Sequence, residues 1–414
     1  MASFYMGGVT GMGMAPLAAF LSDTGNIVRG FDDTPDPEVA SYLAKHGVEI
    51  EPPEGDLRAY DAVVISTALK RRMGEFVEAG AKSVQFRGQC WAQICRKRRL
   101  AAVIGSHGKS TVSALCAHAI IKMNTDAGWL VGAFPNGFEM HRSCAEGRFL
   151  ISEIDESDGT IEGFEPEYVA ALNADLDHTD TYADWSALKC MFERLFSRTK
   201  KAVFFPESDA VLKEVAGKFA DKARPLKISD DFNRTNKIFA RALLEEIFHE
   251  RLPDDIFDDF GGLRRRQETI YKSRNCTVIA DYAHHPSELR AFLKLFNGRY
   301  LDAERTVVFQ PHRYSRTKSF ARDFAEILDG AADSAQVILA PVYAASESFD
   351  PCGTSENIAG ACKNKSIILA NSGEIFNILS RRMANGGKSA IAIVGAGDIY
   401  FETKNFLKDK KCQK

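Results

Sequence analysis

Short apolar runs recur along the chain, and each is followed by a stretch in which apolar residues return at helical spacing. The runs are SFYMGGV, AVVIST, AAVIGS, FLISEID, VAALNAD, CTVIADY, TVVFQP, QVILAPVY and AIAIVGAG. Alternation of buried strands with amphipathic helices is typical of parallel sheets that are covered by helices on both faces. The pattern therefore predicts an α/β protein with doubly wound sheets.

The length of 414 residues and two changes in composition predict three domains. A basic run, CRKRRL, occupies 95–100, and an acidic, glycine-containing stretch followed by arginines occupies 252–267. We expect domains at 1–97, 98–260 and 261–414, each within the usual size of a domain.

Composition narrows the class of protein. The net charge of −3 gives no overall field for nucleic acid, and we expect no nucleic-acid partner. No apolar run is long enough to span a membrane. The 9 cysteines are scattered and form no CxxC pair, which favours reduced thiols, and the first residues, MASFYMGGVTGMG, lack the features of a secretory signal. We therefore expect a cytoplasmic protein.

The segment GSHGKST joins one apolar run to a helical stretch. Gly105 and Gly108 let backbone N–H groups face an anion, and the start of the helix adds a partial positive charge. Lys109 adds a full charge, and the hydroxyls of Ser110 and the threonine after it can meet Mg²⁺. The general phosphate-loop motif has glycine where Val103 stands, so an ordinary glycine turn with a solvent-facing lysine is the alternative.

Acidic residues and a histidine follow the next two apolar runs. Glu153 and Asp155 end one run, and Asp177, His178 and Asp180 follow the other. The carboxyl ends of neighbouring parallel strands meet at one edge of a sheet, so these side chains should face the phosphates of a bound nucleotide. Carboxylates with one imidazole suit Mg²⁺ shared with phosphate oxygens. Helix-capping acids would explain any one cluster, but three converging clusters favour the nucleotide site.

Seven motifs occur in the order found in the Mur ligases: GSHGKST, EIDESD, NADLDHTDTY, DYAHHPSE, QPHRYSRT, PVYAASE and GAGDI. The chain thus resembles this family over almost its whole length. The resemblance implies an N-terminal Rossmann-like domain that binds UDP, a central P-loop-type ATPase domain and a C-terminal Rossmann-like domain. The interval from His178 to Asn233 is short for the family, so we expect a trimmed central domain.

The resemblance also implies a reaction. An ATP-dependent ligase would join the lactyl carboxylate of UDP-N-acetylmuramate to L-alanine, or another small L-amino acid, through an acyl phosphate in peptidoglycan precursor synthesis. ATP and Mg²⁺ would be the cofactors, and because the reactants are anionic, catalysis would rest on charge neutralisation and positioning. Two alternatives stay open: a ligase that adds a tripeptide to the same acceptor, and a nucleotide-binding protein without turnover. The oligomeric state stays open too.

Positions that match the family's motifs receive roles by similarity. The catalytic residues would be Lys109, Glu153, His178, His312, Arg313 and Arg316. The ATP contacts would be Gly105, His107, Gly108, Lys109, Ser110, Thr111, Asn233, Asn236, Arg266, Asp281 and Tyr282. The magnesium ligands would be Ser110, Glu153 and His178. The substrate contacts would be Gly8, Gly11, Gly13, Asp32, Ser66 and His284, although the glycine turn alone would also fit NAD.

Some of these positions have simpler interpretations. One of His284 and His285 can cap the helix that Pro286 begins, and the arginines at 264–266 can form a solvated basic turn. Phe232 stands where the family has histidine, which affects the expected adenine pocket.

Overall fold

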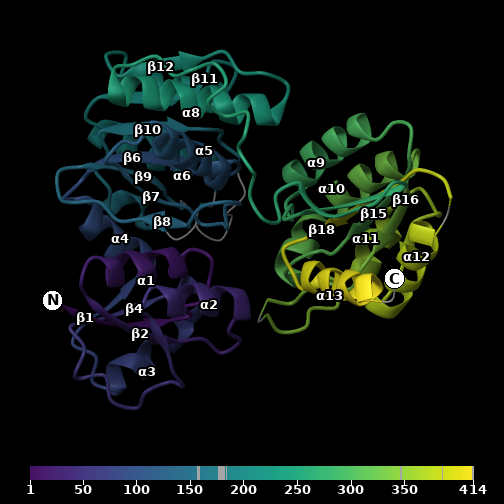
Figure 1. Ribbon diagram of the computed structural model, residues 1–414, viewed down its shortest axis with the longest axis horizontal. Coiled ribbons are helices and arrows are strands. Elements are labelled where there is room, and N and C mark those ends of the chain that lie inside the picture. The colour runs from purple at the N-terminus through teal and green to yellow at the C-terminus, as the bar shows by residue number, and fades with distance from the viewer. Residues whose placement is uncertain (156–158, 176–181, 183, 346, 385, 413–414) are drawn as a thin grey trace. The chain divides into compact units, whose positions relative to one another are not determined.

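The structure, a computed structural model, describes residues 1–155, 159–175, 182, 184–345, 347–384 and 386–412. The chain divides into two compact units, Met1–Gly261 and Gly262–Lys414, which are described separately. Each unit is built from mainly parallel sheets with helices packed against them, two sheets in the first unit and one in the second (Figure 1). The predicted α/β class is confirmed, whereas the predicted boundary after residue 97 stays a prediction.

The first sheet of the first unit is parallel throughout, in the order β3-β2-β1-β4-β5. Its strands are β1 (Ser3–Gly7), β2 (Ile27–Phe31), β3 (Glu49–Ile50), β4 (Ala62–Ile65) and β5 (Val84–Phe86). Its helices are α1 (Met14–Asp23), α2 (Pro37–Lys45), η1 (Thr67–Arg72), α3 (Met73–Glu78) and α4 (Arg87–Cys95). Val64 packs on one face and Val63 and Ile65 on the other, so β4 is apolar at every position.

The second sheet has the order β12-β11-β10-β6-β9-β7-β8, parallel except for the pair β7–β8. Its strands are β6 (Arg99–Ile104), β7 (Gly128–Leu130), β8 (His141–Arg142), β9 (Phe149–Glu153), β10 (Tyr168–Ala171), β11 (Ala202–Pro206) and β12 (Ala223–Leu226). Its helices are α5 (Lys109–Lys122), η2 (Thr160–Gly163), α6 (Trp185–Arg198), α7 (Ala210–Gly217) and α8 (Phe232–Phe248). The strand that leads into the glycine loop, β6, is central, between β10 and β9.

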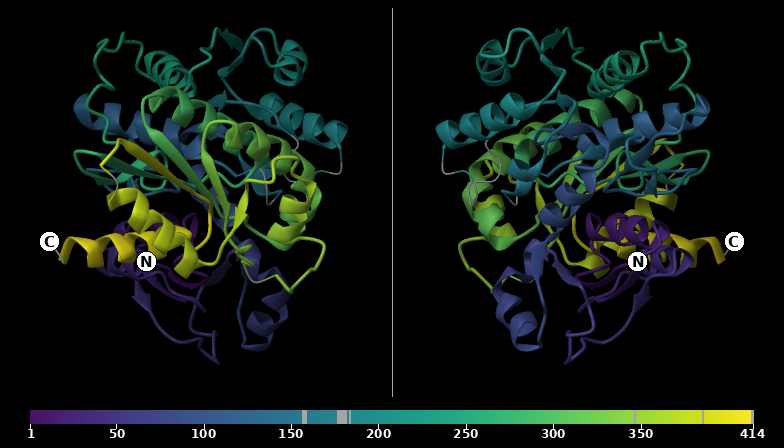
Figure 2. Two further views of the ribbon diagram at one scale, coloured as in Figure 1. Left: turned by 90° about the vertical axis from the view of Figure 1, so that its right-hand side faces the viewer. Right: turned by 90° about the vertical axis from the view of Figure 1, so that its left-hand side faces the viewer.

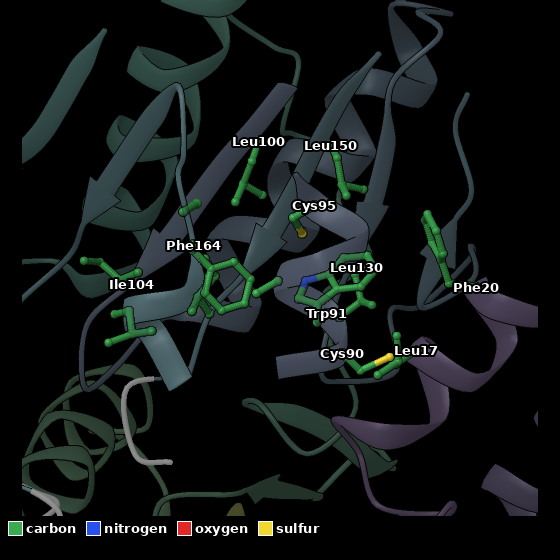
Figure 3. Packing of buried hydrophobic residues seen from close by; sticks show 14 of the residues in the cluster. Leu17, Phe20, Cys90, Trp91, Cys95, Leu100, Ile104, Leu130, Leu150 and Phe164 are labelled. Carbon is green, nitrogen blue, oxygen red and sulfur yellow. The ribbon is translucent and has the colours of Figure 1, made fainter. Parts of the chain in front are cut away.

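One apolar cluster joins the two sheets of the first unit (Figure 3). Trp91 of α4 lies at its centre and is 2% exposed. Its indole N–H donates to Ser152 Oγ of β9 at 2.8 Å. The ring of Phe20, from α1, meets it edge-on with 5.1 Å between ring centroids. The cluster therefore fixes the first sheet's helices against the second sheet.

The sheet of the second unit has the order β13-β14-β18-β15-β16-β17, with only β13 antiparallel to its neighbour among the described pairs. Its strands are β13 (Glu268–Lys272), β14 (Cys276–Asp281), β15 (Glu304–Phe309), β16 (Gln336–Leu339), β17 (Ile368–Leu369) and β18 (Ser389–Val394). One face packs against α9 (Pro286–Arg299), α10 (Tyr314–Ala332) and α11 (Ser355–Ala361). The other packs against α12 (Ser372–Ala384) and α13 (Ile399–Cys412), as Figures 1 and 2 show.

All nine predicted apolar runs become strands: β1, β4, β6, β9, β10, β14, β15, β16 and β18. Most of the strands that the pattern missed are short or lie toward the sheet edges. Strands in such places are less buried than central strands and do not need a continuous apolar run. In the part of the chain that the structure describes, no helix has both the length and the apolar character needed to cross a membrane.

We predict that Trp91→Ala lowers the free energy of unfolding by about 3–5 kcal/mol, because it empties the cluster that joins the two sheets. Trp185, which is 45% exposed, offers the matched control. Trp185→Ala should change the free energy of unfolding by no more than about 0.5 kcal/mol. Urea unfolding followed by circular dichroism measures both, and equal effects would contradict the role assigned to Trp91.

Candidate active site

The glycine loop between β6 and α5 has a backbone that only glycine adopts easily. Gly105 has φ of 125° and Gly108, the residue before Lys109 begins α5, has φ of 86°. A Cβ on Gly105 would lie 3.0 Å from the backbone of Asn173, and one on Gly108 would lie 3.0 Å from Asn236 Oδ1. Both glycines are thus required by conformation and by space, as an anion-binding turn at a helix start would demand.

The segment after β10 holds this loop in place. The backbone N–H of His107 donates to Asn173 Oδ1 at 3.0 Å, and Asn173 Nδ2 donates to the His107 carbonyl at 3.0 Å. Ser106 Oγ donates to the Asp175 carbonyl at 3.0 Å, and His107 Nε2 lies 3.1 Å from Asp175 Oδ2. Sequence reasoning missed Asn173; an asparagine directly after an apolar run is the available signal.

Ser110 and Glu153 meet where β9 ends beside the loop. Ser110 Oγ donates to Glu153 Oε2 at 2.6 Å, and Lys109 Nζ donates to the Gly105 carbonyl at 2.7 Å. A Cβ at Gly132 would lie 1.9 Å from Glu153 Oε1, so the carboxylate occupies space that only glycine leaves open. A hydroxyl and a carboxylate beside a lysine suit Mg²⁺ that also takes phosphate oxygens, so these residues fit the implied ion.

Asn236 of α8 faces the loop with an unused donor. It is 2% exposed, and among the described residues its Nδ2 has no hydrogen-bond partner. A buried amide donor left without an acceptor costs about 1–3 kcal/mol, so an acceptor on a bound molecule would satisfy it. The other predicted asparagine, Asn233, is exposed in the first turn of α8. The ring of Phe232, which stands where the family has histidine, lies 3.5 Å from the Cβ position of Gly108.

The third predicted cluster lies outside the described residues. It comprises Asp177, His178 and Asp180, so the role of His178 as a ligand stays a prediction.

The glycine turn after β1 lies against Ser66 and Arg87. Gly8 has φ of 73°, and a Cβ there would lie 2.8 Å from Ser66 Oγ, so these two predicted substrate residues are adjacent. Gly13 lies against Arg87, whose guanidinium would be 3.2 Å from an added Cβ. Arg87 also lies 3.7 Å from Asp155, after β9. Sequence reasoning missed this arginine, which reaches from the glycine turn to the end of β9.

Asp32, predicted to face a ribose, is hydrogen-bonded within its own domain. Its Oδ2 accepts from the N–H and the hydroxyl of Thr10 at 3.0 and 2.6 Å, and its Oδ1 accepts from the Thr34 N–H at 3.1 Å. Thr10 is therefore part of the same turn. The contact of Asp32 with a ribose stays a prediction.

In the second unit, Asp281 ends β14 in a buried position. Its two oxygens accept from the N–H groups of Gln267 and Ala283, each at 2.9 Å. Burial raises the pKa of Asp281 to about 6, opposed by the nearby Arg266. The carboxylate form therefore dominates at neutral pH, supported by two donors and one cation.

The adjacent arginines Arg265 and Arg266 make different contacts. Arg265 donates to the carbonyls of Gly395 and Gly397 at 3.1 and 2.8 Å. The guanidinium of Arg266 lies 5.2 Å from the ring centroid of Tyr282 and 3.5 Å from Glu288 Oε1. Arg265 thus holds the loop after β18, and Arg266, beside Asp281, is the arginine better placed for the predicted nucleotide contact.

Imidazoles and arginines converge where β14, β15 and β16 end. The rings of His284 and His312 lie 5.7 Å apart, and Tyr343 stacks on His312 at 5.6 Å between centroids. Arg316 Nη1 lies 3.3 Å from His312 Nδ1, and the Arg313 N–H donates to the Tyr343 carbonyl at 2.8 Å. Neutral imidazoles beside two guanidinium groups suit a carboxylate ligand.

Of the two adjacent histidines, His285 is the helix cap. Its Nδ1 accepts from the N–H of Ser287 at the start of α9, with Glu288 completing a capping box. Residue 284 is thus the histidine that lies toward His312.

We predict that His284 and His312 stay neutral to below pH 5. Burial lowers the pKa of His284 to about 4 and that of His312 to about 3. Both native pKa values lie below the unfolded value of about 6.5, so the unfolded chain takes up protons first as the pH falls. The stability that the two neutral histidines contribute is therefore full above pH 6.5 and is lost as the pH falls toward the native pKa values. NMR titration of the imidazole Cε1–H signals, assigned with H284Q and H312Q, measures this. A midpoint above pH 6 for either would show that the burial argument is wrong.

The sequence matches two models of one protein family. Residues 3–99 match the family described as "Mur ligase family, catalytic domain", and residues 265–399 match "Mur ligase, glutamate ligase domain". The chain is 28% identical to the UDP-N-acetylmuramate–L-alanine ligase of Anaeromyxobacter sp. (strain Fw109-5), over 96% of this chain and 95% of that one. It is 29% identical to the ligase of the same name from Oleidesulfovibrio alaskensis, over 86% and 87% of the two chains.

Solved structures share the fold. The UDP-N-acetylmuramate-alanine ligase of Thermotoga maritima has a TM-score of 0.80 at 21% identity, over 100% of both chains. A murein peptide ligase from Psychrobacter arcticus has a TM-score of 0.70 at 18% identity, over 99% of this chain and 98% of that one. The two family matches together cover more than half of the 414 residues, the motifs follow the same order, and the chain belongs to the Mur ligase family.

Proposed function

We propose that this chain catalyses ATP-dependent amide formation between the lactyl carboxylate of UDP-N-acetylmuramate and L-alanine, a cytoplasmic step of peptidoglycan precursor synthesis. Curated relatives with nearly full-length coverage carry the name of this activity. The observation that carries the proposal is the Ser110–Glu153 pair beside the glycine loop at the start of α5.

The chemistry explains why such residues are needed. Transfer of the γ-phosphoryl group of ATP to a carboxylate oxygen gives an acyl phosphate and ADP, and the amine of L-alanine then attacks the carbonyl carbon as phosphate leaves. Several anionic groups must come together, so neutralising their charge and orienting them are the main tasks of the protein. A bound Mg²⁺ supplies further neutralisation of the phosphate oxygens.

The first unit would hold the phosphates. The N–H groups at the start of α5 and the ammonium of Lys109 would bind the triphosphate. Ser110 and Glu153 would hold Mg²⁺, and the unused donor of Asn236 would meet an acceptor on the nucleotide. The turn that contains Gly8, with Ser66 against it, would receive the UDP portion of the acceptor.

The second unit would hold the amino acid. Arg313 and Arg316 would bind its carboxylate, with the fork of each guanidinium matching two oxygens. His312 would contribute hydrogen bonds as a neutral group, because a pKa of about 3 makes it a poor proton acceptor at neutral pH.

The activity is tested by incubating the protein with Mg-ATP, UDP-N-acetylmuramate and L-alanine, glycine, L-serine or a stem tripeptide. Phosphate release and product mass are measured. With L-alanine we expect phosphate release and a product with the mass of the amide. Turnover with the tripeptide alone would replace the proposal with a murein peptide ligase, and no turnover with any of the amino acids or the tripeptide would indicate a nucleotide-binding protein.

Lys109→Ala should lower kcat by at least about 100-fold, since one preorganised charge at a transferring phosphoryl group is lost. Lys122→Ala, at the far end of the same helix, is the control and should keep wild-type turnover. Circular dichroism checks that both variants are folded. Wild-type turnover in K109A would remove the loop from the mechanism.

Gly132→Ala tests whether the position of Glu153 matters. The added methyl would displace the carboxylate from Ser110, so the Mg²⁺ concentration for half-maximal rate should rise by about 10-fold or more. Gly217→Ala, where an added Cβ meets nothing within 4 Å, is the control. An unchanged magnesium dependence in G132A would refute the role of this pair.

A further inference from the structure

We propose that Asp23, His46 and His141 form a binding site for a transition-metal ion of the zinc type, with a water molecule in the fourth position. None of these residues belongs to the proposed ligase site. The site would lie where helices of the first sheet meet the edge of the second sheet, inside the first unit.

Separate elements bring these side chains together. Asp23 is the last residue of α1, His46 directly follows α2, and His141 begins β8, the edge strand of the second sheet. Helix α1 and strand β8 lie side by side (Figure 1). His141 is 3% exposed, and the side chain of His46 is 12% exposed, so both imidazoles are largely removed from water.

The three side chains already lie close to the spacing that a bound metal ion requires. His46 Nδ1 lies 3.2 Å from Asp23 Oδ1, and His141 Nε2 lies 2.9 Å from Asp23 Oδ2. One ligand atom from each of these three residues lies within 4.8 Å of the other two. Tetrahedral zinc, with bonds of about 2.0–2.2 Å, places its ligand atoms roughly 3.3 Å apart. Small side-chain rotations therefore suffice.

Neighbouring groups lie at the outer nitrogen of each imidazole. The Tyr42 hydroxyl lies 2.6 Å from His141 Nδ1, and metal-bound histidines usually have such a partner on the second ring nitrogen. Within the described part of the chain, the buried His46 Nε2 has no hydrogen-bond partner. Glu139 Oε2 stands 3.8 Å from it, on the side of the ring away from Asp23, where a small movement would let the carboxylate accept from this nitrogen while Nδ1 binds the ion.

The donor set points to zinc-type ions over magnesium. Magnesium and calcium prefer sites made wholly of oxygen, whereas two imidazoles with one carboxylate match the nitrogen and oxygen ligands of Zn²⁺. The partly exposed carboxylate of Asp23, with its side chain 35% exposed, leaves the ion a path from solvent. A bound ion would link α1 and α2 to β8 and so stabilise the first unit.

The test uses the full-length protein, stripped with a chelator and dialysed against Zn²⁺ with millimolar Mg²⁺ present to compete at the phosphate site. Metal content is measured by mass spectrometry, and Tm is measured with and without zinc. We expect wild type to retain one more equivalent of zinc than His46→Gln. At a free zinc concentration 100 times the Kd, Tm of the first unit should rise by about 5–10 °C.

His118 provides the matched control. It faces one carboxylate, Asp259, at 3.1 Å, and its side chain is 13% exposed, close to the value for His46. His118→Gln should bind zinc as wild type does, and Asp23→Asn should lose the bound equivalent. In wild type, Co²⁺ in place of zinc should give the strong visible absorption of tetrahedral coordination. Equal zinc content and equal Tm shifts in wild type and H46Q would overturn the proposal.

Discussion

The position of β6 between β9 and β10 is the constraint on which the first site depends. Because the three strands are parallel neighbours, the glycine loop, Glu153 and Asn173 must all emerge at one edge of the sheet. Burial of the apolar strands stabilises the sheet, and the sheet in turn holds the polar groups in position. Asn173 hydrogen-bonds the backbone of the loop, while Glu153 receives the hydroxyl of Ser110.

Much of this could be predicted because apolar runs and motifs are local signals. The nine runs located the central strands, and GSHGKST located the turn before α5. The approach of Glu153 to Gly132, and of Arg87 to Gly13, depends on residues far apart in sequence, and neither spacing nor composition encodes such distances. Asn173 is an intermediate case, since its place after a strand was visible but its two hydrogen bonds were not.

The second unit shows a similar division. Its motifs indicated which residues would gather where β14, β15 and β16 end, but not the state of their protons. Burial, which no motif reports, makes His312 a neutral neighbour of Arg316. Nor did the motif show that Arg265 would bond the loop after β18 while Arg266 would lie beside Asp281 and Glu288.

Arg313 shows what such a site demands of the backbone. It has φ of 71°, a conformation that costs a residue with a side chain about 1–3 kcal/mol. Glycine would relieve this strain but would supply no cation. In the proposed role of Arg313, the strained backbone lowers the stability of the fold locally in order to place a cation at the amino-acid site, and selection for heat resistance alone would favour glycine at this position.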